Sequence, residues 1–376
     1  MESVTISVVG DVMVGGILSS NIEKYKEIFL SKEILEILNS ADIRFCNLES
    51  PLSKLEEPPE PDKTLLHAKE ESIEFIKKAG FNIVSLANNH SMDFGWMSLK
   101  RTIDLLKENN IKYIGAGKNL QEAREPVFFD ISQMKIAFLA YTWTPPLFEE
   151  GSKAATDSSP GVSPYNLKYM RNDIEKIRNN VDIIIISMHW GEEFTHYPTP
   201  KVVSDAHSII DMGADIILGS HPHVLQGYES YHKGLIFYSL SNFLFSPWFG
   251  VNDGRWINYK EEGKIRRWYR ESREGVVLKF KFNEDKYFDY IIIPTIQDKK
   301  KPFVRIPPQK DKNKILKQIK KWSSEYSNRY YSKNHQILIE KERRFNFFKV
   351  IKNEIDTYGW VGTFKKGWNK FLRLIK

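Results

Sequence analysis

Five short apolar segments of this 376-residue chain each end in polar side chains, and this pattern limits the possible fold more than any other feature. The segments are rich in valine and isoleucine, which are typical of β-strands. Ligand sites in open α/β sheets lie just outside the carboxyl ends of the strands, so the five polar endings are predicted to meet at one rim. The segments are Val4–Val9, Ile43–Phe45, Ile83–Leu86, Ile183–Met188 and Asp215–Leu218.

The last of these segments leads into His221-Pro222-His223, in which two imidazoles stand one residue apart. Gly219 permits a sharp turn on which both side chains can point at one ion. Neutral imidazole nitrogens are good ligands for zinc, iron and manganese. For this pair alone, two solvent-exposed loop histidines are the alternative interpretation.

The other strand ends favour the metal interpretation because they add carboxylate, amide and imidazole groups. Such a mixed set suits manganese, iron or zinc better than calcium. One or two divalent transition-metal ions are therefore expected as cofactors, and a pair of ions usually means hydrolysis by a metal-activated water. An imidazole beside a ligated amide, as His90 is, can protonate a leaving group. The predicted ligands are Asp11, Glu49, Asn89, His189, His221 and His223.

The segments between the strands show helical periodicity, so strands and helices alternate along the chain. This alternation predicts a layered α/β/β/α sandwich of mixed sheets. With 41% hydrophobic residues, the chain can bury one large core or two modest ones. Two long loops, Ser50–Leu65 and Thr144–Tyr165, are expected to form walls of the site. The expected helices are Glu70–Ala79, Leu99–Asn109, Asn166–Asn179 and Pro200–Met212, and β-rich segments follow at 234–245 and 275–296.

A set of motifs in fixed order closely resembles the CapA-type poly-γ-glutamate capsule biosynthesis family, a branch of the calcineurin-like metallophosphoesterases. The resemblance spans roughly residues 4–296 and implies a metallophosphoesterase-like fold. The motifs are Gly10-Asp11, Asn47–Leu52, Ser85–His90 with Asp93 and Gly95, Gly115–Gly117, His189–Phe194, Gly219–Val224 and Tyr238–Phe243.

The resemblance implies roles for further residues. It assigns catalysis to His90, Asp93 and Glu193. It assigns substrate binding to Asn88, Asn242 and Trp190. The implied substrate is a polyanionic polymer, or a compound with a phosphate or amide group.

Three positions depart from the wider pattern. Metallophosphoesterases generally begin with Asp-x-His, but Met13 stands where the histidine would be, so the first metal site has one ligand fewer. Glu49 replaces the usual bridging aspartate, and Ser241 stands where the branch more often has glycine. The first two departures are usual in the CapA branch, so they bear on phosphatase activity rather than on membership.

Charge divides the chain into two predicted domains, residues 1–297 and 298–376. The second has 22 Lys or Arg against 7 Asp or Glu, a net charge of +15, whereas the first has 33 against 41, a net charge of −8. In the second, Ile315, Ile319, Trp322 and Tyr326 share one face of a predicted helix. This basic helical extension could pack on the core, lie on an anionic membrane, contact a synthase subunit or bind an acidic polymer, with nucleic acid less favoured.

A second basic stretch, Lys264–Arg270, is either a clamp for phosphate or carboxylate or a solvated hairpin edge, and the hairpin edge is favoured.

The single cysteine, Cys46, excludes an intrachain disulfide and is expected to be a core residue. The start at Met1 lacks the basic and apolar regions of a signal peptide, and no stretch reaches the roughly 18 apolar residues of a spanning helix. We therefore expect a cytoplasmic protein that is peripheral, if at all, at the inner membrane leaflet.

Three functional classes fit the sequence. The first is a metal-dependent hydrolase that serves capsule, poly-γ-glutamate or another cell-envelope polymer. The second is a phosphoesterase acting on a nucleotide or a lipid-linked phosphate, against which Met13 counts. The third is a non-catalytic assembly factor for a membrane-bound polymer synthase. Fold analogy does not choose among them.

Overall fold

The computed structural model describes most of the chain. It covers residues 3–15, 18–19, 29–54, 65–144, 153–245, 251–252, 255–256, 272–283, 288–298, 303–326 and 331–342. The basic stretch Lys264–Arg270, residues 55–64 and 145–152 of the two expected wall loops, and the aromatic end of the chain lie outside these residues.

The first of two large sheets has the strand order β18-β17-β16-β1-β2-β3-β4, and β13 also pairs with β1. Strand β1 is parallel to β2 and β13 and antiparallel to β16, so the sheet is mixed. In register, Asp11 stands opposite both Asn47 and Asn242. The strands are β1 (Val4–Met13), β2 (Ile43–Leu48), β3 (Ile83–Ser85), β4 (Lys112–Ile114), β13 (Asn242–Phe245), β16 (Glu274–Phe282), β17 (Phe288–Gln297) and β18 (Val304–Arg305).

The second large sheet has the order β11-β12-β10-β9-β7-β6. Its central strands β7, β9, β10 and β12 are parallel, and β6 and β11 close the edges as antiparallel strands. The strands are β6 (Val127–Ile131), β7 (Met134–Thr142), β9 (Ile183–His189), β10 (Ile216–Ser220), β11 (Tyr228–Tyr231) and β12 (Gly234–Phe237). Two small antiparallel pairs are β5 (Ala116–Gly117) with β8 (Gly161–Val162) and β14 (Val251–Asn252) with β15 (Arg255–Trp256).

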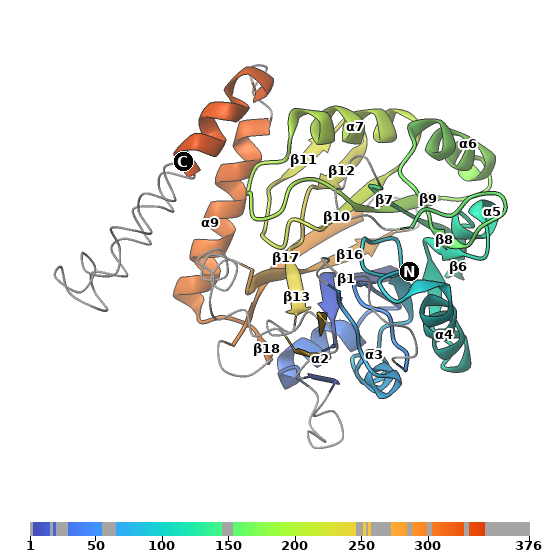
Figure 1. Cartoon of the computed structure of the whole chain (residues 1–376). Helices are drawn as coiled ribbons and strands as arrows, with labels where there is room; N and C mark the ends of the chain where they lie inside the picture. Colours follow the sequence, from blue (N-terminus) through green and yellow to red (C-terminus); the bar gives the residue numbers. More distant parts are fainter. Residues whose placement is uncertain are drawn as a thin grey trace, which may run out of the picture. The chain divides into compact units, whose positions relative to one another are not determined.

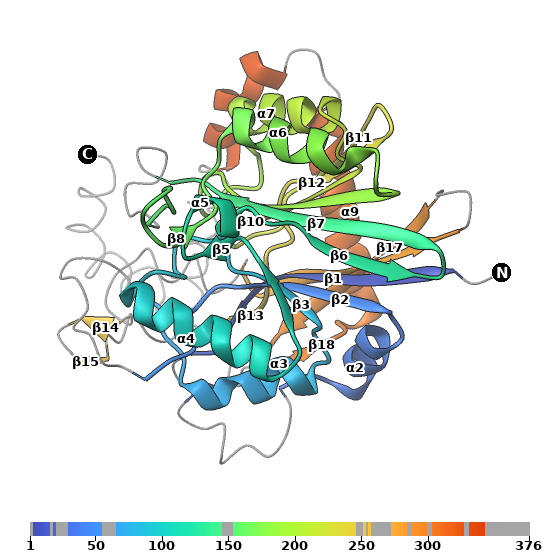
Figure 2. The ribbon, with the colours of Figure 1, turned by 90° about the vertical axis from the view of Figure 1, so that its right-hand side faces the viewer.

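Helices cover the outer faces of both sheets, which confirms the predicted four-layer α/β/β/α sandwich (Figures 1 and 2). In Figure 2, α6 and α7 lie beyond one sheet, and α2, α3 and α4 lie beyond the other. The helices are α2 (Lys32–Asn39), η1 (Glu70–Ser72), α3 (Ile73–Lys78), α4 (Gly95–Glu108), α5 (Leu120–Ala123), α6 (Leu167–Arg178), α7 (Pro200–Asp211) and α9 (Gln309–Tyr326).

Local chemistry explains where these helices begin. The Thr199 hydroxyl accepts a hydrogen bond from Val202 N, and Pro200 takes the first helical position of α7, where its missing N–H costs nothing. The Asn166 side chain caps α6 in the same way. Helix α4 begins four residues before the expected Leu99, because Gly95 adopts a positive φ of 76° that lets the chain turn into the helix directly.

The core lies between the sheets and beneath the helices. Phe45 of β2 stacks on Phe138 of β7 with ring centroids 5.8 Å apart, which joins the two sheets face to face. Cys46 is fully buried, and burial raises the pKa of its thiol, so it is the core residue that its apolar neighbours indicated.

The chain forms two compact units, Met1–Ser327 and Asn328–Lys376. The first unit contains both large sheets and also α9, which contacts β11 of one sheet and β17 of the other. The shared face of α9, Ile315, Ile319, Trp322 and Tyr326, is buried. The second unit has a helix over 331–342 among its described residues. None of the described helices is both long enough and apolar enough to cross a membrane.

Candidate metal centre

The predicted ligands lie at neighbouring strand ends of the two sheets. Asp11 is inside β1, Glu49 directly follows β2, and Asn89 follows β3, all in the first sheet. His189 ends β9, and His221 and His223 follow β10, in the second sheet. All six side chains are buried, with at most 7% of their surface exposed. The structure therefore brings together the six residues that the strand endings indicated.

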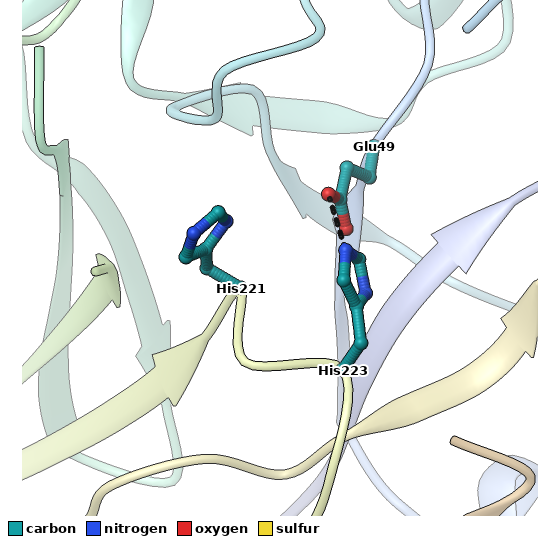
Figure 3. Close-up of side chains that lie close together, drawn as sticks. All are labelled: Glu49, His221 and His223. Atoms are coloured by element: carbon teal, nitrogen blue, oxygen red, sulfur yellow. Dashed lines mark ion pairs between the residues drawn. The ribbon is translucent and has the colours of Figure 1, made fainter. Parts of the chain in front are cut away.

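Glu49 is the centre of this cluster. One of its carboxylate oxygens, Oε1, lies 3.8 Å from His189 Nε2 and 3.7 Å from His223 Nε2. The carboxylate points toward the ring of His223, and His221 and His223 rise from one loop (Figure 3). Ligand atoms of Glu49, His221 and His223 lie within 4.8 Å of one another, as do those of Asp11, Glu49 and His189. Such separations fit ligands that surround a common ion, each at about 2.0–2.2 Å from it.

The loop that holds the two histidines is conformationally unusual. His221 has a φ of 95° and His223 a φ of 54°, a left-handed region that residues other than glycine seldom adopt. Backbone strain of this kind costs about 1–3 kcal/mol per residue and is concentrated at functional sites. In this loop the ring of His223 faces both carboxylates, with Nδ1 3.7 Å from Asp11 Oδ2 and Nε2 3.7 Å from Glu49 Oε1. The amide of His221 donates to Asp11 Oδ2 at 3.3 Å.

The buried carboxylates and imidazoles of this cluster form a donor set that fits a cation. Burial and the nearby Asp11 charge raise the pKa of Glu49, and burial also raises the pKa of Asp11. Burial lowers the pKa of His189, His221 and His223, which favours the neutral imidazoles that bind metals. Both oxygens of Glu49 lack a hydrogen-bond partner among the residues that the structure describes. Buried carboxylates in this state are costly unless they are paired, so the donor set fits a metal ion.

Residues 5–247 match the family described as bacterial capsule synthesis protein PGA_cap. The chain belongs to this capsule synthesis family. It is 30% identical over 357 residues to the "Capsule biosynthesis protein CapA" of Bacillus anthracis, covering 91% of this chain and 81% of that protein. It is 30% identical over 263 residues to the "PGA biosynthesis protein CapA" of Bacillus subtilis strain 168, covering 69% and 68%. The family resemblance inferred from the motifs is thus confirmed.

Among solved structures, a 5'-nucleotidase from Candida albicans aligns with a TM-score of 0.42 and 14% identity, covering 91% of this chain and 58% of that chain.

In this PGA_cap chain, further polar side chains hold the ligands in place. Ser220 Oγ lies 2.9 Å from His189 Nδ1, and Asn242 Oδ1 lies 2.8 Å from His223 Nδ1, so the Nε2 atoms of both rings face the cluster. Asn89 Oδ1 is 2.9 Å from His189 Nε2, which places an amide oxygen beside an imidazole nitrogen as a shared metal would need. Partners of this kind fix the orientation of the metal ligands.

Asn47 and Ser220 hold the cluster together in ways that the strand endings did not predict. The Asn47 amide donates to Asp11 Oδ1 at 2.8 Å and lies 3.3 Å from His189 Nδ1, so it links the two sheets. Its position two residues before Glu49 was the available signal, because side chains at i and i+2 of a strand point to the same side. Ser220 is the last residue of β10, directly before His221.

The three residues assigned to catalysis lie beside the ligands. His90 Nδ1 is 2.7 Å from Asp93 Oδ2, and that carboxylate also accepts the Leu66 amide at 2.7 Å. Glu193 is exposed, and its negative charge contributes to the raised pKa of Glu49. Glu193 therefore lies on the solvent side of the cluster, whereas His90 and Asp93 are buried within it.

The three residues assigned to substrate binding are all buried. Asn88 donates to Asn47 Oδ1 at 3.2 Å and to Leu48 O at 2.9 Å. Asn242 donates to Ser272 O at 3.2 Å while its oxygen faces His223. Trp190 is fully buried, and its indole donates to Tyr238 O at 3.2 Å. The contacts of these three side chains are with the protein's own framework.

Met13 occupies an apolar position next to the cluster. It is 1% exposed and packs with Leu66 and Phe245, and its sulfur accepts the Gly15 amide at 3.1 Å. Phe245 lies edge-on to His223 with ring centroids 5.0 Å apart. Met13, Leu66 and Phe245 therefore form an apolar wall beside the cluster.

Proposed function

We propose that this chain is a metal-dependent hydrolase that acts in the synthesis of poly-γ-glutamate or another cell-envelope polymer. The observation that carries the proposal is the buried Glu49 carboxylate, which lies within 4 Å of two imidazoles and has no hydrogen-bond partner among the described side chains. The names of the Bacillus relatives support the polymer, and the mixture of nitrogen and oxygen donors favours manganese, iron or zinc.

The residues of the site divide into those that would hold the metal and those that would transfer protons. Asp11, Glu49, Asn89, His189, His221 and His223 would hold the metal, which supplies an activated water and polarises the substrate oxygen. His90 carries the proton for the leaving group, because Asp93 holds Nδ1 and so orients the ring and its Nε2 atom. Glu193, at the solvent side, meets the substrate first. Asn88, Asn242 and Trp190 fix the loops around this chemistry.

Met13 favours a second candidate, a non-catalytic assembly factor that uses metal for binding. With an apolar wall beside His223, the first metal site has one ligand fewer than a two-metal phosphoesterase. One firmly held ion is enough to tie the two sheets together. This candidate predicts bound metal without turnover.

A hydrolysis screen separates these candidates. Protein loaded with manganese, iron or zinc would be tested on poly-γ-glutamate, on phosphate monoesters and on phosphate diesters. We expect hydrolysis in one class, lost by at least about a hundredfold in His221→Ala, since removal of a ligand disturbs both binding and activation of water. His232→Ala is the matched control, because this exposed histidine pairs with Asp211 outside the cluster. Metal-loaded wild-type protein that cleaves none of them would favour the assembly factor.

A further inference from the structure

Helix α9 has one face buried in the core. Ile315, Ile319, Trp322 and Tyr326 are each at most 8% exposed. Trp322 stacks on His196 with ring centroids 4.1 Å apart, and the helix contacts both β11 and β17. Its apolar side is therefore already covered by the protein, and only its polar side faces solvent.

The solvent side of α9 carries a stripe of lysines, Lys310, Lys314, Lys317 and Lys321. All four are exposed, and their spacings of four, three and four residues place them on one helical face about 16 Å long. Lys320 is exposed beside them. None of these lysines has an ion-pair partner among the described residues.

Four lysines of other described helices are paired with an acidic residue. Lys32 pairs with Glu36, Lys77 with Glu74, Lys100 with Asp104 and Lys201 with Asp205, each three or four residues away. In α9, lysines of the stripe have other lysines three or four residues away, as Lys314 has Lys310 and Lys317, and only Asp311 and Glu325 add negative charge to the helix. Like charges at this spacing destabilise a helix. A polyanion bound along the lysines would neutralise this repulsion and so stabilise the helix.

We propose that the lysine stripe of α9 binds an acidic polypeptide, namely the polyglutamate chain of the proposed function, on which this inference rests. Its charge is complementary to a row of carboxylates. A helix that inserts into a membrane surface would need an exposed apolar face, and the apolar face of α9 is buried against the sheets. The stripe therefore holds polymer by charge alone, and binding weakens as salt screens it.

Binding of fluorescently labelled poly-γ-glutamate to the full-length protein, followed by anisotropy, tests this proposal. The variant changes Lys310, Lys314, Lys317 and Lys321 to Gln. We expect its affinity to fall by about tenfold or more, since exposed ion pairs each contribute modestly and add up. The control changes four exposed lysines elsewhere, Lys168, Lys176, Lys233 and Lys281, to Gln, and it should bind like wild type.

Three outcomes would overturn the proposal. They are equal polymer binding by wild type and stripe variant, an equal loss in the control variant, and binding by the wild type to anionic vesicles but not to the polymer. Failure of the proposed hydrolase gives a different result: stripe-dependent polymer binding would persist while the hydrolysis screen shows no turnover. Circular dichroism of both variants checks that the substitutions leave the fold unchanged.

Discussion

A chain that ends after residue 308 is expected to lose both metal binding and cooperative folding, whereas a chain that ends after residue 327 is expected to keep both. The difference is α9 alone. Each of its four buried apolar side chains contributes roughly 1.5–3 kcal/mol, so the loss approaches the 5–15 kcal/mol that stabilises a typical domain. Thermal unfolding and metal content of the two fragments measure the effect.

Metal binding should fail with folding because α9 ties down the loop that carries the histidines. The hydroxyl of Tyr326 accepts the Gly227 amide at 2.8 Å, and that of Ser323 accepts the Tyr228 amide at 2.9 Å. Gly227 lies four residues after His223, and Trp322 of the same helix covers His196, seven residues after His189. The helix thus packs on two of the chain segments that leave the metal cluster, those after His189 and after His223.

Tyr326→Phe tests this role more narrowly than truncation, since it keeps the buried ring and removes only the hydroxyl. Leaving the buried Gly227 amide unsatisfied costs about 1–3 kcal/mol, which should lower the unfolding midpoint and weaken metal binding. Tyr231→Phe is the control, because its hydroxyl makes a long 3.4 Å contact to the exposed Asp211. A 1–308 fragment that folds and binds metal like the full chain would contradict this account of α9.

His90→Gln is expected to retain metal and to lose turnover by on the order of a hundredfold, the usual contribution of a general acid. The expectation follows from geometry, because His90 is buried beside the ligands and its Nδ1 is held by Asp93 at 2.7 Å. The measurement is the turnover rate on the substrate class found by the hydrolysis screen, together with metal content. His207→Gln is the matched control, since His207 pairs with Glu229 at 3.0 Å outside the cluster. Equal loss of metal and turnover in His90→Gln would instead make His90 a ligand.

The layers of the fold and the composition of the cluster could be predicted from the sequence because strand ends carry both signals. An apolar run fixes the strand, and the polar residue after it can lie only at the carboxyl rim. Asp11, Glu49 and His189 are examples: each stands within or just beyond a run of buried residues. Family membership followed from the same residues, because their order along the chain is specific.

The partners within the site were less predictable. The direction of a side chain depends on backbone geometry that the sequence does not display, such as the positive φ values of His221 and His223. Trp190 illustrates the difficulty: it adjoins a ligand, yet its side chain is directed into the core, where the indole bonds Tyr238. The packing of α9 stayed open for another reason, since an apolar face flanked by lysines fits both a core helix and a membrane-surface helix, and the structure shows this face buried.

Titration of metal-stripped protein with manganese and zinc, with bound metal counted by elemental analysis, tests the central claim most directly. The wild-type protein should bind at least one transition-metal ion per chain. His223→Ala should weaken binding by more than about a hundredfold, because loss of a partner that only orients a ligand already costs roughly 10–100-fold. His232→Ala should bind like the wild type. Wild-type protein that takes up neither metal, or that binds equally well in both variants, would contradict the assignment of this cluster as a metal centre.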